Sequence, residues 1–220
     1  MIRKFVPLIA VILSCCATTV PPDAGPKAEE TLLDLLKHDA ALAPCPSDRF
    51  LTLSGEITEE SADATARAIR GCEGHEILIE FNSLGGSVFA AMEIQRAIER
   101  HDRPVSCIAD GPVMSAAFVT FQSCAHRYVT DRAILMAHEA SLGARGQSQE
   151  FSNAADALRV VNWTMAEHCA RRMGISHEEF AARVANGQEW HFSQADALRF
   201  HAADDPADSI AAALALLKGG

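Results

Sequence analysis

The pattern of apolar and polar residues predicts alternating strands and helices from about residue 49 onward. Residues 50–57 alternate like a half-buried strand, and three short apolar runs are typical of buried strands. These runs cover residues 77–81, 105–109 and 133–137. Strands that alternate with helices at these lengths predict an α/β fold with a mostly parallel sheet.

Capping residues and apolar periodicity mark the expected helices. A loop at residues 82–86 precedes the helix that Ser87 begins, and Gly174 ends a long helix whose apolar residues keep a 3.6-residue period. The expected starts are at Thr58, Ser87, Phe151, Ser176, Ser193 and just after Pro206.

Candidate chemistry concentrates in residues 104–138. A strand at 105–109 leads through a turn at Gly111–Pro112 to Ser115, which opens a buried helix. A serine at such a turn lies near free N–H groups and the positive end of the helix. His138, at the tip of the strand at 133–137, could act as its base. A simple helix cap and a strand-end histidine fit the local pattern too.

The first 48 residues predict an export signal followed by a tether. Residues 1–16 join a charged start to a short apolar segment, as a signal peptide does, and Cys16 or Cys15 fits a lipid-modified N-terminus. Residues 17–48 form a tether with a short helix, and residues 49–220 form the domain. We therefore expect an exported bacterial protein, either periplasmic or anchored to a membrane by its lipid.

Composition restricts the partners. The net charge of −10 and the absence of a basic stripe argue against nucleic acid. The nine histidines show no metal-ligand spacing, so we expect no metal and no cofactor. In an oxidising compartment, the candidate disulfides are Cys45–Cys72 and Cys107–Cys124. Buried free thiols are the alternative, because spacing does not fix connectivity.

From about Arg49 to Asp208 the chain resembles the proteolytic subunit of the Clp protease (ClpP), in the clan that also holds the crotonases. The resemblance implies repeated β-β-α and βαβ units, a mostly parallel sheet and a protruding helical handle. It rests on FNSLGGS at 81–87, GPVMSAAF at 111–118, LMAHEA at 135–140, GARGQSQEF at 143–151 and GQEWHFSQADAL at 187–198.

The resemblance implies a role for each candidate residue. Ser115 is the nucleophile and His138 the general base, and Glu189 falls where the family has its aspartate. The backbone N–H groups of Gly85 and Ala116 bind the oxyanion. Asp196 and Asp204 are weaker alternatives for the acid.

The expected function is that of a serine endopeptidase acting on peptides or unfolded proteins outside the cytoplasm, without an ATPase. No lysine lies between Lys37 and Lys218, so a serine–lysine dyad has no candidate base. The resemblance also implies a homo-oligomeric ring. An inactive binding or assembly module is the alternative, which Glu189 and the Ala116–Ala117 pair favour as departures from the family. A crotonase-like enzyme that uses only the oxyanion pocket fits less well.

Overall fold

Seven strands form one sheet in the computed structural model, which describes residues 42, 44–141 and 147–218. The central order is β1-β2-β3-β4-β7, and β5 pairs with β3 and with β6. Apart from the antiparallel β5–β6 pair, the pairings between described strands are parallel. The expected α/β fold is confirmed. The strands are β1 (Phe50–Ile57), β2 (Ile77–Gly86), β3 (Val105–Met114), β4 (His126–Val129), β5 (Ile134–Ala137), β6 (Trp190–Phe192) and β7 (Asp205–Pro206).

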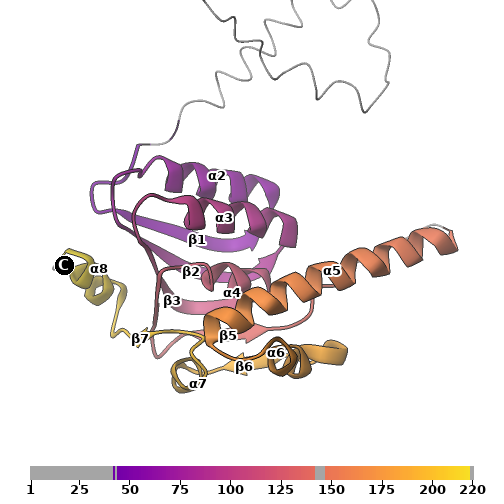
Figure 1. Cartoon of the computed structure of the whole chain (residues 1–220). Coiled ribbons are helices and arrows are strands. Elements are labelled where there is room, and N and C mark those ends of the chain that lie inside the picture. The colour runs from indigo at the N-terminus through magenta and orange to yellow at the C-terminus, as the bar shows by residue number, and fades with distance from the viewer. Residues whose placement is uncertain (1–41, 43, 142–146, 219–220) are drawn as a thin grey trace, which may run out of the picture. The chain divides into compact units, whose positions relative to one another are not determined.

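Helices lie on both faces of the sheet (Figure 1). The larger core joins one face to α2, α3, α4 and α5, whereas α8 packs with Leu78 and Ile108 on the other. The helices are α2 (Glu59–Arg70), α3 (Val88–Arg100), α4 (Ala116–Phe121), α5 (Ser148–Met173), α6 (His177–Val184), α7 (Gln194–Arg199) and α8 (Ile210–Lys218), with a 3-10 turn at Ala185–Gly187.

The long helix α5 is the expected handle. Its buried residues all lie in its C-terminal third, and its N-terminal part extends beyond the rest of the domain (Figure 1). Gly174 ends α5 in the left-handed conformation, with φ 70°. The handle is therefore fixed at one end only within the described residues.

Two segments predicted to be irregular are strands instead. The predicted loop at residues 82–86 completes β2, where Gly85 and Gly86 pair with Glu56 and Ile57. The predicted turn at Gly111–Pro112 lies within β3, because β5 pairs with Pro112 to Met114 further along the chain. Local composition could not reveal either distant partner.

The N-terminal predictions lie mostly outside the described residues. These predictions are the signal peptide at 1–16, the cysteines Cys15 and Cys16, and the helix within the tether. Where the tether enters the domain, Cys45 is bonded to Cys72 beside the end of α2. Across the described segments, no helix is long and apolar enough to cross a membrane.

Candidate active site

Ser115 lies at the junction of β3 and α4 with an uncommon backbone conformation. Its φ is 55° and its ψ is −125°, and a positive φ outside glycine often marks a functional site. Its N–H donates to the carbonyl oxygen of Met136, 2.9 Å away. Among the described atoms, the Ser115 side chain makes no capping hydrogen bond to α4, so its hydroxyl is free for another partner.

That partner is His138. Because β5 runs parallel to β3, with Met136 beside Met114, the ends of the two strands meet. The Nε2 atom of His138 lies 2.7 Å from the Oγ atom of Ser115. For Nε2 to accept the hydroxyl proton, the neutral imidazole must carry its own proton on Nδ1. The pair has the arrangement of a serine nucleophile and its base.

The two predicted oxyanion donors border Ser115. Ala116 is the first residue of α4, so its N–H has no acceptor within the helix. A β-carbon built on Gly85 would lie 3.1 Å from the Ala116 nitrogen, which shows how closely the two segments approach. In this structure the Gly85 N–H donates to Ser83 Oγ at 3.0 Å. Of the two predicted oxyanion donors, the Gly85 N–H is therefore already bonded, whereas the Ala116 N–H has no acceptor within its helix.

Glu189 does not contact His138 in the described structure. Its carboxylate lies 3.6 Å from Nε2 of His191, and both side chains are about half exposed. The antiparallel register ends at Ala137 opposite Trp190, so its next step would set His138 opposite Glu189. The described pairing stops one residue short of this step, so the role of Glu189 stays a prediction.

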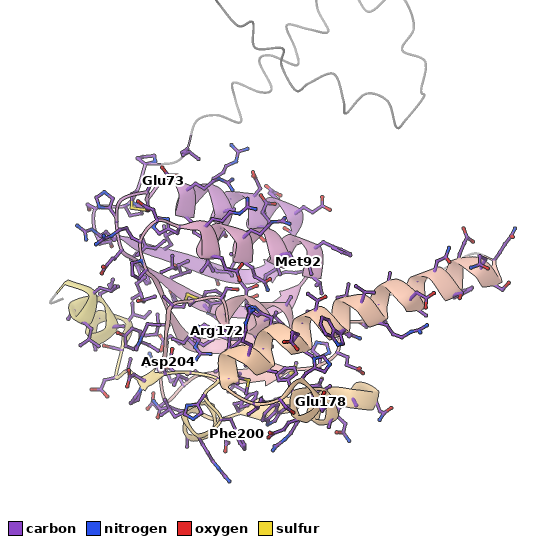
Figure 2. All side chains as sticks on the ribbon, viewed as in Figure 1. Glu73, Met92, Arg172, Glu178, Phe200 and Asp204 are labelled. Carbon is purple, nitrogen blue, oxygen red and sulfur yellow. A yellow bond between two sulfur atoms is a disulfide. The ribbon has the colours of Figure 1, made fainter. Side chains whose placement is uncertain are left out.

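The two weaker alternatives are occupied elsewhere. Asp196 accepts a hydrogen bond from the Ser193 hydroxyl at 2.7 Å, in the first turn of α7. Asp204, which Figure 2 labels, binds the buried guanidinium of Arg127. Arg127 also contacts Gln122. These contacts argue against both aspartates as the third residue.

The Arg127 cluster is not among the features predicted from the sequence. Arg172 on α5 donates to the carbonyl oxygens of Gln122 and Cys124, just past the end of α4. Free carbonyls at a helix end need such donors when they are buried. The available signal was Arg127, a charged residue directly before the apolar pair Tyr128–Val129 in HRYV.

A disulfide joins the two elements that flank Ser115. Cys107 of β3 is bonded to Cys124, which follows α4, with their Cα atoms 5.9 Å apart. The bridge closes the chain segment that contains Ser115 at its tip. It therefore holds the end of the serine helix against its own strand.

A cavity of about 230 Å³ opens beside His138. Its apolar lining includes Val119, Met165, Cys169, Phe180 and Val184. Burial raises the pKa of the Cys169 thiol well above its usual range, so this cysteine stays protonated and is no competing nucleophile. Within the described residues, no group of three or more metal-ligating side chains occurs.

Comparison with known proteins agrees with the resemblance in the sequence. The sequence model of a family described as Clp protease matches residues 41–205. The ATP-dependent Clp protease proteolytic subunit of Ligilactobacillus salivarius (strain UCC118) is 28% identical over 130 residues. That match spans 54% of this chain and 66% of the relative, just under two thirds of its length. The chain belongs to the Clp protease family.

Proposed function

We propose that this protein is a serine endopeptidase that cleaves peptides or unfolded proteins. The observation that carries the proposal is the 2.7 Å separation between Ser115 Oγ and His138 Nε2, beside the free N–H of Ala116. Membership of the Clp protease family supports peptidase chemistry. The cavity beside His138 offers an apolar surface for a substrate side chain.

Acylation follows from this geometry. His138 Nε2 takes the hydroxyl proton as Ser115 Oγ bonds to the substrate carbonyl carbon, and the carbonyl electron pair moves onto oxygen. The Ala116 N–H binds that oxyanion. The Gly85 N–H joins it when its bond to Ser83 yields to the stronger, charged acceptor. The imidazolium then protonates the departing amine as the carbon–nitrogen bond breaks.

Deacylation uses the same groups. Water replaces the amine, loses a proton to His138 and attacks the acyl carbon, and the proton returns to Ser115 Oγ as the acid leaves. Glu189, brought to the Nδ1 side of His138, would hold the imidazole in the required tautomer. Such a move requires its carboxylate to leave His191.

We propose that the protein works outside the cytoplasm and without an ATPase. The two disulfides support an oxidising compartment, because such bonds are rare in the cytosol. The relative's name describes an ATP-dependent enzyme. An exported protein has no ATP supply, so its substrates would be peptides or loosely folded chains. Cell fractionation and the mass of the mature N-terminus would test export and lipidation at Cys15 or Cys16.

We also expect assembly into a homo-oligomeric ring. Phe151, Val160 and Trp163 are apolar residues of α5 that the single chain leaves at least half exposed. Another copy of the chain would cover such residues. Light scattering tests this expectation, and a monomer at all concentrations would contradict it.

The direct test of the function is peptide cleavage. A mixture of unstructured peptides would be incubated with the wild type and with Ser115→Ala, purified in the same way, and the products read by mass spectrometry. Internal cleavage by the wild type alone is the expected result. Equal cleavage by both proteins would refute the proposal.

An inactive binding or assembly module remains the second candidate. The observation that favours it is the Glu189 carboxylate, which lies at His191 and leaves His138 Nδ1 without a described acceptor. A well-folded wild type that binds peptides but never cleaves them, in every oligomeric state, would favour this candidate.

A further inference from the structure

Asn162 is a polar residue on the inward side of α5. Helical spacing aligns it with Met165, Ala166 and Cys169, which are all buried. It therefore lies about one turn before the region where α5 becomes buried against the domain. The Asn162 side chain is partly buried, and its amide oxygen accepts a hydrogen bond in the described structure.

Its partner belongs to the segment that carries His138. The Ala140 N–H donates to Asn162 Oδ1 at 2.8 Å. Residues 138–141 follow β5 and have left the ladder with β6, whose last pair is Ala137 with Trp190. In the described structure, this is the one hydrogen bond that ties the backbone of this segment to another element.

We propose that Asn162 is a positioning residue for His138, an inference that rests on the proposed peptidase function. By fixing the Ala140 amide, it sets the path of the chain immediately after the base. Asn162 also lines the cavity beside His138. Through this bond, the handle helix holds the imidazole at hydrogen-bond distance from Ser115.

The expected effect of replacing Asn162 follows from the hydrogen bond that it accepts from Ala140. Alanine at 162 removes the acceptor, so residues 138–140 gain freedom and the base loses its alignment. A displacement of about 1 Å in a reacting group can cost roughly 100-fold in rate. Aspartate keeps an oxygen where Asn162 has one and adds a negative charge near the imidazole. That charge favours the protonated imidazole.

The experiment compares the wild type, Asn162→Ala, Asn162→Asp and a matched control, Asn153→Ala, on the full chain. Asn153 lies on the exposed part of α5 and bonds only with Gln149 in the described structure. The values of kcat and KM for one fluorogenic peptide are measured against pH. Hydrogen exchange at the Ala140 amide provides a readout that does not depend on activity.

For Asn162→Ala we expect kcat to fall about 10- to 100-fold with little change in KM, and exchange at Ala140 to rise at least tenfold. Asn162→Asp should recover most of kcat and move the acid limb of the pH–rate profile to higher pH. Asn153→Ala should match the wild type in every measurement.

Three results would overturn the inference. They are an unchanged kcat in Asn162→Ala, an equal loss in Asn153→Ala, and no recovery of kcat in a well-folded Asn162→Asp. In all three, Ser115-dependent cleavage by the wild type would leave the peptidase proposal standing. If the wild type shows no cleavage beyond that of Ser115→Ala, the proposed function fails and the inference fails with it.

Discussion

Gly85 and Ser115 touch with no room for a side chain between them. A β-carbon on Gly85 would lie 2.8 Å from the β-carbon of Ser115 and 2.7 Å from the carbonyl oxygen of Met114. The φ of Gly85 is 100°, a conformation that residues with side chains rarely adopt. Both the space and the backbone conformation thus require glycine at the predicted oxyanion donor.

Gly85→Ala should therefore lower kcat/KM by about 100-fold or more, the usual cost of losing an oxyanion donor. Peptide hydrolysis measures the loss. Gly74→Ala is the matched control, because Gly74 has a φ of 82° but a β-carbon there would meet nothing within 4 Å. That variant should lose only about 1 kcal/mol of stability. Equal activity in the two variants would contradict this account of Gly85.

Glu189→Gln should lower kcat at least tenfold if Glu189 orients the imidazole, because a neutral amide supports the Nδ1–H tautomer less well. His191→Ala should keep or raise kcat, since it frees the Glu189 carboxylate from its present neighbour. Both variants would be assayed on one peptide substrate. Full activity in Glu189→Gln would remove Glu189 from the site.

Loss of the Cys107–Cys124 disulfide should impair both stability and activity. Changing both Cys107 and Cys124 to Ala removes a bridge with a sequence separation of 17. Urea unfolding should show a free energy of unfolding lower by roughly 3 kcal/mol. Removing Cys45–Cys72, with a separation of 27, should cost a similar amount. Only the first change frees the end of α4, so only it should lower the activity of the folded protein. Equal activities in the two disulfide variants would show that the Cys107–Cys124 bond does not influence Ser115.

The Arg127–Asp204 pair should make the free energy of unfolding fall at low pH. Burial alone would raise the pKa of Asp204, but the hydrogen bonds and charge of Arg127 outweigh it and hold that pKa below its ordinary value. The resulting stability is present above about pH 3.9, the ordinary value, and is lost as the pH falls through the lower folded-state pKa.

Asp204→Asn should therefore reduce the free energy of unfolding by about 3 kcal/mol at neutral pH, because it leaves Arg127 buried without a counter-ion. The variant should also lose less stability than the wild type below pH 4. Urea unfolding across pH measures both effects. Asp156→Asn, which breaks an exposed pair with Arg159, should cost under about 1 kcal/mol. If Asp204→Asn lost as little stability as Asp156→Asn, the proposed role of the buried Arg127–Asp204 pair would be contradicted.

Local pattern predicted the elements that carry a clear apolar period or cap. The strand at Phe50–Ile57 and the helices that follow Thr58, Ser87 and Ser176 occur where expected, because the capping side chain binds the first turn in each helix. These features depend only on neighbours in the sequence.

The sequence did not predict the short strands β4, β6 and β7, because they depend on partners that are distant in the chain. Trp190 to Phe192 form a strand because they pair with β5, far away in the chain. The same dependence explains the wrong loop at 82–86 and the wrong turn at Gly111–Pro112. Pairing across the sheet, rather than local composition, decides these segments.

The candidate site also contains some residues that the sequence predicted and others that it could not. The motifs around Ser115 and His138 named residues that the structure brings to 2.7 Å, since β3 and β5 end side by side. Asn162 could not be identified, because its role depends on a single bond to Ala140. The position of the Glu189 carboxylate beside His191 was equally out of reach, because local sequence does not fix the conformation of an exposed side chain.

The central claim is that His138 activates Ser115. A fluorophosphonate probe on the purified oxidised protein tests it most directly, with the adduct mapped by mass spectrometry in the wild type, Ser115→Ala and His138→Ala. We expect one adduct on Ser115 in the wild type, none in Ser115→Ala, and labelling at least 100-fold slower in His138→Ala. An unlabelled but folded wild type, or equal labelling without His138, would contradict the account.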